Sequence, residues 1–365
     1  MTGDAHSFDM AGLGSALFHR LEVSALKRLF SQYCTHDALN LCGGLPLPSV
    51  FPLQSLDFSL GEDSLSLRAD SDLHLNYMRG DGVRGLKEWI QRHMETLHPA
   101  PRPFATCMSV GATDSVAKVF ELFRGDCVLF DSFAYNTSLA ACKAIGRQCI
   151  GVRGDDEGML PEALREQTLL ARQLGLHPDM VYLVPTAQNP LGVTMSDQRK
   201  RAIYLTCREL GLVIIEDGKA NLYTPRVVDF LPVDAYYYLS FDDDAIPGVT
   251  GLPKSLLSMD SDGRVVRIDT VSKFIAPGFR LGWVSGPPGF VSKYQILQEM
   301  TGQFACGISQ SIFLGMVTSW GEVGLDFHLR QVQSDHIMLL DVMDGRFNCT
   351  TFGRETISVK PFALS

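Results

Sequence analysis

The chain has 365 residues, of which 45% are hydrophobic, and a formal net charge of −9. This composition predicts a globular protein with a substantial core, and the acidic balance argues against nucleic acid or an anionic membrane as the main partner. No apolar run approaches the ~18 residues of a membrane span, and the first ten residues lack the basic and apolar regions of a signal peptide. The nine cysteines form no Cys-x-x-Cys pair, so neither a metal site nor a disulfide framework is expected. We therefore expect a cytoplasmic protein that acts on small molecules.

Strand-like and helix-like segments alternate along the chain. After a Pro-rich stretch at 41–52 that indicates an extended arm, short apolar runs predict strands at 127–131, 148–152, 180–185, 212–217, 264–269 and 281–285. Helical spacing is found at 113–124, 135–146, 196–210 and 289–301, and again from 303 to about 345. The segment 232–263 is a long turn-rich connection, and a short strand-like TISVK lies near the end. This order predicts an α/β fold with a mostly parallel, mixed sheet flanked by helices, and a ligand site beyond the carboxyl ends of its strands.

Two glycine-containing segments are candidates for a phosphate site. Gly80-x-Gly82-x-x-Gly85 matches the dinucleotide fingerprint, but no convincing buried strand precedes it, so a glycine turn is the better interpretation. The small-residue loop from Ser109 to Thr113 opens a helix, whose N-terminal amides and dipole favour an anion. An ordinary helix N-cap explains the same residues, and the loop alone does not decide between the two.

Polar side chains follow several predicted strands. Asn189 stands before a proline, where its amide could donate to a ligand or simply form a turn. Asp217 closes an apolar strand, where a carboxylate could meet a cationic ring nitrogen, bind a metal or cap the next turn. Lys273 lies in apolar surroundings that favour a nucleophilic amine, although most lysines in loops are solvated. Each residue alone is weak, and what indicates one site is the order of the whole set: phosphate loop, Tyr135, Asn189, Asp217, Lys273 and Arg280.

That order resembles the fold-type I, pyridoxal-phosphate-dependent aminotransferases of class I/II, and is most similar to their kynurenine/α-aminoadipate and fungal aromatic amino acid branch. The resemblance covers roughly residues 38 to 330. The arm NLCGGLPLPSVFP is similar to the branch's GGLPNPxxFP segment, and Thr270-Val-Ser-Lys273 through Gly278-Phe-Arg280 to its (S/T)-x-S-K-x-x-x-x-G-x-R pattern. It implies a cofactor-binding large domain at 61–305, an arm with part of a small domain at 1–60, and a linking helix with an incomplete small domain at 306–365.

The resemblance also implies roles for single residues. Lys273 would carry the cofactor, pyridoxal 5'-phosphate, and then act as the base of the transfer, while Asp217 would pair with the protonated ring nitrogen. Tyr135 would stack on the ring and Asn189 would hydrogen-bond the ring oxygen. Gly44 and Asn189 would contact the substrate. The cofactor phosphate would be held by Ala112, Thr113, Thr270 and Arg280, and by Tyr77 from the neighbouring subunit of a homodimer.

The implied reaction moves an amino group from an aromatic or kynurenine/aminoadipate-like amino acid to a 2-oxo acid. Two departures leave alternatives open. Ala220 stands where the branch has a tyrosine that contacts the ring oxygen, with Tyr223 as a substitute, and this leaves room for a C–S lyase on the same scaffold. The arginine that clamps the substrate carboxylate in the family has no counterpart before Ser365. A shortened, catalytically inactive relative that binds the cofactor or a partner subunit is therefore a third hypothesis.

Overall fold

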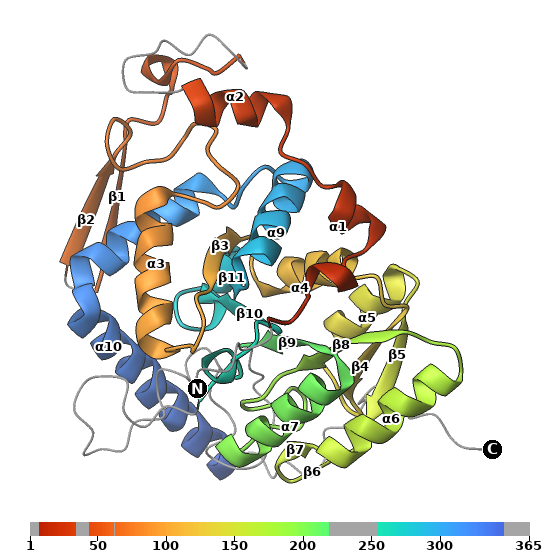
Figure 1. The fold of residues 1–365 in the computed structure, drawn as a ribbon. Helices are drawn as coiled ribbons and strands as arrows, with labels where there is room; N and C mark the ends of the chain where they lie inside the picture. The colour runs from red at the N-terminus through yellow and green to blue at the C-terminus, as the bar shows by residue number, and fades with distance from the viewer. Residues whose placement is uncertain (1–6, 34–43, 62, 219–253, 347–365) are drawn as a thin grey trace, which may run out of the picture.

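A seven-stranded sheet forms the centre of the protein (Figure 1). The computed structural model describes residues 7–33, 44–61, 63–218 and 254–346. Along the sheet the order is β3-β11-β10-β9-β8-β4-β5, and within this sheet only β11 runs against the other strands. The strands span Ala105–Ser109 (β3), Cys127–Asp131 (β4), Gln148–Val152 (β5), Pro178–Leu183 (β8), Val213–Asp217 (β9), Val265–Thr270 (β10) and Gly282–Gly286 (β11). The predicted α/β fold with a mostly parallel, mixed sheet is confirmed.

Helices cover both faces of this sheet, and its central strands are therefore buried on both sides. Successive strand residues point to opposite faces, so Val128 and Phe130 join one apolar cluster while Cys127 and Leu129 join the other. The first cluster is covered by α4 (Ala112–Leu122), α5 (Asn136–Ala144) and α9 (Pro288–Thr301), with the short α1 (Ala16–Arg20). The second is covered by α3 (Arg84–Leu97), α6 (Pro161–Gln173), α7 (Asp197–Leu210) and α10 (Gly307–Arg346).

The smaller elements lie around this core. The helix α2 (Ala25–Tyr33) and a turn of 3-10 helix at Pro48–Val50 belong to the N-terminal part of the chain. They precede an antiparallel hairpin of β1 (Ser55–Leu60) and β2 (Asp63–Arg68), which packs against α10 (Figure 1). A second, very short hairpin pairs β6 (Gly154–Asp155) with β7 (Gly158–Met159). Further 3-10 turns are found at Ala11–Leu13, Leu257–Met259, Val271–Lys273 and Pro277–Phe279.

The predicted elements agree best with the structure where they are apolar and central. The strands 127–131 and 148–152 have the predicted bounds, and the other predicted strands are shifted by one or two residues. The segment around Gly82 is a turn before α3, with a φ of 102° at Gly82, as the glycine-turn interpretation expects. Residues 232–253 of the long connection and the strand-like TISVK lie outside the described residues. The domain bounds stay a prediction.

The described residues contain neither a membrane-spanning helix nor a metal-binding cluster. No helix among them is long and apolar enough to cross a membrane. They also contain no cluster of three or more His, Cys, Asp or Glu side chains that could hold a metal ion. The expected cytoplasmic location stays a prediction.

Candidate active site

The predicted site residues on the sheet lie along its carboxyl edge. In the register of the sheet, Thr270 at the end of β10 pairs with Gly282, and Gly282 pairs with Ser109 at the end of β3. On the other side of β10, Ile268 pairs with Asp217, the last residue of β9. Because these parallel strands end at one edge, the segments that follow them meet there. The sheet therefore brings the phosphate loop, Asp217 and the Thr270–Lys273 turn to the same side of the molecule.

Arg280 lies against the N-terminus of α4 and forms a corner with it. Gly111 precedes the helix with a φ of 97°, a conformation that favours glycine. Arg280 lies against this residue: its Nη2 donates to the Val110 carbonyl at 3.1 Å, and a Cβ added to Gly111 would lie 2.8 Å from the same nitrogen. Ala112 and Thr113 form the first turn of α4. The start of the helix with its dipole and an exposed guanidinium together suit a phosphate group.

Thr270 and Lys273 are joined by a single 3-10 turn. The Thr270 Oγ1 accepts from the Ser272 amide at 3.2 Å, which caps this turn, and donates to the Leu281 carbonyl at 2.9 Å. While the second bond is kept, Thr270 has no proton to give to a phosphate oxygen. The half-buried Ser272 hydroxyl lies 2.8 Å from Thr270 Oγ1, and because the Thr270 proton points to Leu281, Ser272 is the donor of this bond. Lys273, also half-buried, ends the turn.

Asp217 is fully buried and accepts the last hydrogen bond of a chain of two hydroxyl groups. Tyr182, on the adjacent strand β8, donates its phenolic proton to Asp217 Oδ2. Ser138 on α5 in turn donates to the Tyr182 oxygen at 3.0 Å. Burial, followed by the neighbouring Asp217 charge, holds the pKa of Tyr182 well above its usual value of 10. A carboxylate in this setting is fixed in position and suits a cationic partner.

The loops after β4 and β8 contribute Tyr135 and Asn189. Tyr135 is the N-cap residue of α5 and is half-buried, and Asn189 is buried before a cis proline. Gln188 joins the two loops, because its side-chain amide donates to the Phe133 carbonyl while its Oε1 accepts from the Leu191 amide at 3.0 Å. Both side chains are thus carried by loops that are hydrogen-bonded to each other.

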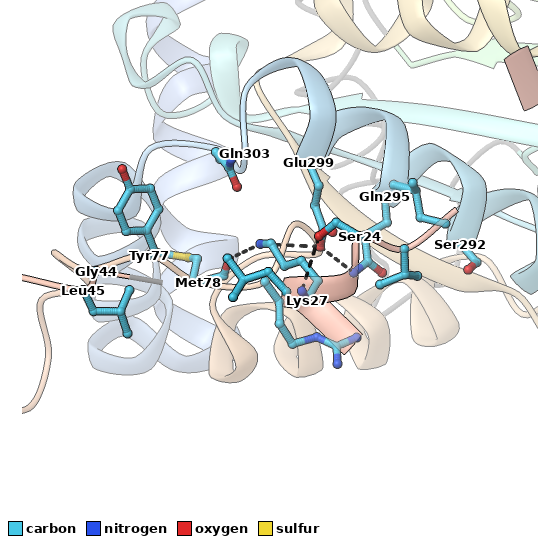
Figure 2. A pocket seen from close by; sticks show the side chains of 14 residues that line it. Ser24, Lys27, Gly44, Leu45, Tyr77, Met78, Ser292, Gln295, Glu299 and Gln303 are labelled. Carbon is cyan, nitrogen blue, oxygen red and sulfur yellow. Dashed lines mark hydrogen bonds and ion pairs between the residues drawn. The ribbon is translucent and has the colours of Figure 1, made fainter. Parts of the chain in front are cut away.

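Tyr77 and Gly44 lie in a different place. They line a pocket of about 730 Å³ between α2, the N-terminal arm and α9, and the lining contains none of the other predicted site residues (Figure 2). Figure 2 shows Lys27 and Glu299 facing each other inside it, 3.9 Å apart. Tyr77 is 62% exposed and its ring meets Phe304 edge-on. The predicted site residues therefore form two groups within one chain.

Two residues with a role in this geometry were missed by the sequence reasoning, Tyr182 and Ser272. Tyr182 sits inside the apolar run MVYLVP, and a lone hydroxyl in a buried strand is a signal that it needs a hydrogen-bond partner. Ser272 lies inside the quoted lysine motif, but only the 3-10 turn that follows β10 puts its hydroxyl beside Thr270. Ala220 and Tyr223 lie outside the described residues.

Comparisons with known proteins agree on one family. No family model matches the chain. A mitochondrial kynurenine/α-aminoadipate aminotransferase of Mus musculus is 30% identical over 312 residues, which are 80% of this chain and 67% of the relative. An aromatic amino acid aminotransferase of Schizosaccharomyces pombe is 29% identical over 350 residues, 84% of this chain and 70% of the relative. The crystal structure of aminotransferase Aro8 from Candida albicans superposes with a TM-score of 0.78 at 25% identity, covering 93% of this chain and 77% of that one.

The fold and the residues along the sheet edge define the class of the protein. It is a pyridoxal-phosphate-dependent transferase of fold type I, the fold shared by a Pyrococcus horikoshii kynurenine aminotransferase solved with PMP (TM-score 0.62, 22% identity, covering 94% of this chain and 79% of that one). Within that class, the chain belongs to the family of the aromatic amino acid and kynurenine/α-aminoadipate aminotransferases.

The residues present fit this cofactor. Pyridoxal phosphate carries an anionic phosphate, a basic ring nitrogen and an aldehyde, and it needs an anion site, a carboxylate and an amine at matching places. The corner of Gly111 and Arg280, the buried Asp217 and the half-buried Lys273 supply these groups at one sheet edge. A side chain at Gly111 would collide with Arg280, so the corner is shaped for close approach to the backbone.

Proposed function

We propose that the protein moves an amino group from an aromatic or kynurenine/aminoadipate-like amino acid to a 2-oxo acid, an activity of class EC 2.6.1.-. One observation carries this proposal: the Lys273 turn, the corner of Arg280 and Gly111, and the buried Asp217 meet at one edge of the sheet. The bound cofactor supplies an aldehyde that captures the amino group and a cationic ring that withdraws electrons from the substrate Cα. The names of the relatives motivate the choice of substrates.

Each polar residue of the edge then has a separate task. The Lys273 Nζ holds the cofactor between turnovers and, once released, accepts the proton from the substrate Cα. Asp217 keeps a proton on the ring nitrogen through its negative charge. Asn189 donates its side-chain amide to the ring oxygen and borders the substrate. Tyr135, which begins α5, lies with its ring against the face of the cofactor ring.

The phosphate group is anchored by several donors. The amides of Ala112 and Thr113 begin α4, and the Arg280 guanidinium adds a positive charge beside them. Thr270 caps the lysine turn, and it contributes its hydroxyl to the phosphate by exchanging its bond to the Leu281 carbonyl for one to a phosphate oxygen. These contacts fix one end of the cofactor and so set where its reacting carbon lies relative to Lys273.

A homodimer would place the second group of residues at an active site. Tyr77 is largely exposed and lines the same pocket as Gly44, and Lys273 is not among the residues that line this pocket. We propose that Tyr77 donates to the phosphate of the neighbouring subunit and that Gly44 borders the substrate there. The exposed apolar side chains beside the pocket, among them Val23, Leu26 and Met300, suit such an interface.

The two other hypotheses raised by the sequence have different support. The relatives reported above are named aminotransferases, and this favours transfer over the elimination catalysed by a C–S lyase. Ala220, which left the lyase open, and the residues after 346 lie outside the described residues. A normal cofactor adduct without either half-reaction would support the catalytically inactive alternative.

The proposal is tested with purified protein and pyridoxal phosphate. We expect a yellow protein whose colour is lost with borohydride, and a reduced cofactor attached to Lys273 in the peptide map. Lys273→Ala should abolish this adduct, whereas Lys143→Ala, an exposed lysine on α5, should keep it. Tyrosine, kynurenine and 2-aminoadipate are then paired with 2-oxoglutarate. A colourless protein that does not bind the cofactor would rule out the proposed function, and release of pyruvate and ammonia from a cysteine conjugate would favour the lyase.

A further inference from the structure

Behind Asp217 lies a buried chain of hydrogen bonds that the roles above do not use. Tyr182 donates to Asp217 Oδ2 and Ser138 donates to Tyr182. We propose that Tyr182 is a positioning residue, which holds the Asp217 carboxylate in the orientation that meets a protonated ring nitrogen. This inference rests on the proposed function and adds to it a specificity for cofactors that carry a basic nitrogen at that place.

The direction of each hydrogen bond follows from the groups involved. An ionised carboxylate only accepts, so the single phenolic proton of Tyr182 must point to Asp217. The Ser138 hydroxyl must then donate to the Tyr182 oxygen, over 3.0 Å. A chain of two donors ending on one carboxylate oxygen strengthens the last bond and stabilises the charged form of the acid.

Burial stabilises the hydrogen bonds between Ser138, Tyr182 and Asp217. Tyr182 is 1% exposed and its ring packs against Phe120 and Phe130, which prevents the phenol from turning away. Asp217 and Ser138 are also buried, so water does not compete for these bonds. The raised pKa of Tyr182, caused by burial and then by the Asp217 charge, keeps the phenol protonated and donating. Ser138 lies on α5, the helix that Tyr135 begins, so the same chain joins the ring-stacking helix to the strand carrying Asp217.

Tyr204 offers a matched control elsewhere in the protein. It too is a buried tyrosine whose hydroxyl is bonded to carboxylates, with Asp262 Oδ1 at 2.8 Å and Asp260 Oδ1 at 3.1 Å. It lies on α7, behind the other face of the sheet. Tyr204→Phe therefore removes the same chemical group from a similar environment without touching Asp217.

The experiment compares two ligands, pyridoxal phosphate and its 1-deaza analogue, in which a carbon replaces the ring nitrogen. Their dissociation constants are measured by equilibrium dialysis with the wild type, Tyr182→Phe, Tyr204→Phe and Asp217→Asn. We expect the wild type to prefer pyridoxal phosphate. Tyr182→Phe should weaken pyridoxal phosphate roughly ten- to a hundredfold, the range for loss of a hydrogen bond to a charged group, and leave the analogue within about twofold. Asp217→Asn should reduce the preference at least as much, and Tyr204→Phe should not change it.

The outcomes separate the two proposals. If the wild type binds neither ligand and forms no reducible adduct, the proposed function fails and the inference with it. If the wild type prefers pyridoxal phosphate but Tyr182→Phe weakens both ligands equally, or neither, the positioning role alone is wrong. If urea unfolding shows that Tyr182→Phe does not fold, Ser138→Ala is used in its place. A smaller loss of the preference for pyridoxal phosphate in Ser138→Ala then supports the inference, and an unchanged preference overturns it.

Discussion

Two aspartates, at the ends of β9 and β4 on either side of β8, lie in different surroundings. Asp217 accepts a hydrogen bond from Tyr182, whereas Asp131, at the end of β4, is buried and no cation among the described residues contributes to its pKa. Burial raises the pKa of Asp131 to about 7, against a smaller opposing effect of a hydrogen bond from Gln188. The Asp131 side chain is thus mostly neutral in weakly acidic solution.

This difference predicts how stability depends on pH. Between the ordinary pKa of 3.8 and the folded value of about 7, Asp131 binds a proton in the folded protein but not in the unfolded chain. Its contribution to the free energy of unfolding therefore falls as the pH rises through this range. In Asp131→Asn that fall should disappear, which reduces the loss of stability between pH 5 and pH 8 by about 2 kcal/mol relative to wild type.

Urea unfolding at the two pH values measures this effect on the apoprotein. Asp156→Asn is the control, because Asp156 is exposed in the nearby turn between β6 and β7. Equal pH dependence in wild type and Asp131→Asn would contradict the prediction.

At the scale of elements, α4 binds an anion only if its first residues approach the ligand closely. Gly111→Ala should weaken this site for two reasons: alanine is strained at a φ of 97°, and its Cβ would displace the Arg280 guanidinium, 2.8 Å away. We expect the affinity for pyridoxal phosphate to fall about tenfold or more, with little change for pyridoxal, which has no phosphate. Fluorescence titration with both ligands measures this.

Gly211→Ala is the matched control for Gly111→Ala. Gly211 ends α7 with a φ of 68°, so alanine is strained there as well, but a Cβ at this position meets nothing within 4 Å. It should lose stability like Gly111→Ala and keep its affinity for pyridoxal phosphate. If both variants lose affinity equally, the effect comes from general strain rather than from the corner of α4.

The ends of β9 and β10 are joined by ion pairs on the face of the sheet opposite to the Asp217 side chain. Arg267 is buried between Glu216 and Asp269, at 2.9 and 2.6 Å. Arg267→Met should lower the free energy of unfolding by about 3 kcal/mol, because it leaves two carboxylates buried without their cation. Arg165→Met breaks the more exposed pair with Glu209 on α6 and α7 and should cost less than about 1 kcal/mol. Similar urea midpoints for the two variants would be the contrary result.

The sequence predicted the elements whose signal is local and missed those that depend on partners. The strands at 127–131 and 148–152 are apolar runs between turns, and Ser196, the first residue of the predicted segment 196–210, is the N-cap of α7. The hairpin β1–β2 alternates polar and apolar residues but was not predicted, since its apolar face is only completed by α10. α3 and α6 were also missed. In the site, Asp217 and Lys273 follow strands and could be identified, whereas the bond from Tyr182 depends on the pairing of β8 with β9.

At the scale of the whole molecule, the separation of Tyr77 from Lys273 leads to a test of shared active sites. In a hybrid dimer of one Lys273→Ala and one Tyr77→Ala subunit, one site would lack both residues and the other would have both. In the complete site, Lys273 comes from the Tyr77→Ala subunit and Tyr77 comes from the Lys273→Ala subunit. If Tyr77 instead acted within its own subunit, no site of the hybrid would be intact. The two arrangements thus differ in whether mixing two defective chains restores a site.

The hybrid is isolated from coexpressed chains with two different tags and treated with limiting pyridoxal phosphate and then borohydride. Lys273→Ala homodimers should fix no cofactor, and Tyr77→Ala homodimers should fix little, because their phosphate contact is lost. We expect the hybrid to fix nearly as much as a control hybrid of Lys273→Ala with wild type, in which the single remaining lysine site is also complete. A hybrid that fixes as little as the Tyr77→Ala homodimer would mean that Tyr77 does not serve the neighbouring site. A monomer in sedimentation of the cofactor-bound wild type would rule out the dimer itself, and the exposure of Tyr77 would then need another explanation.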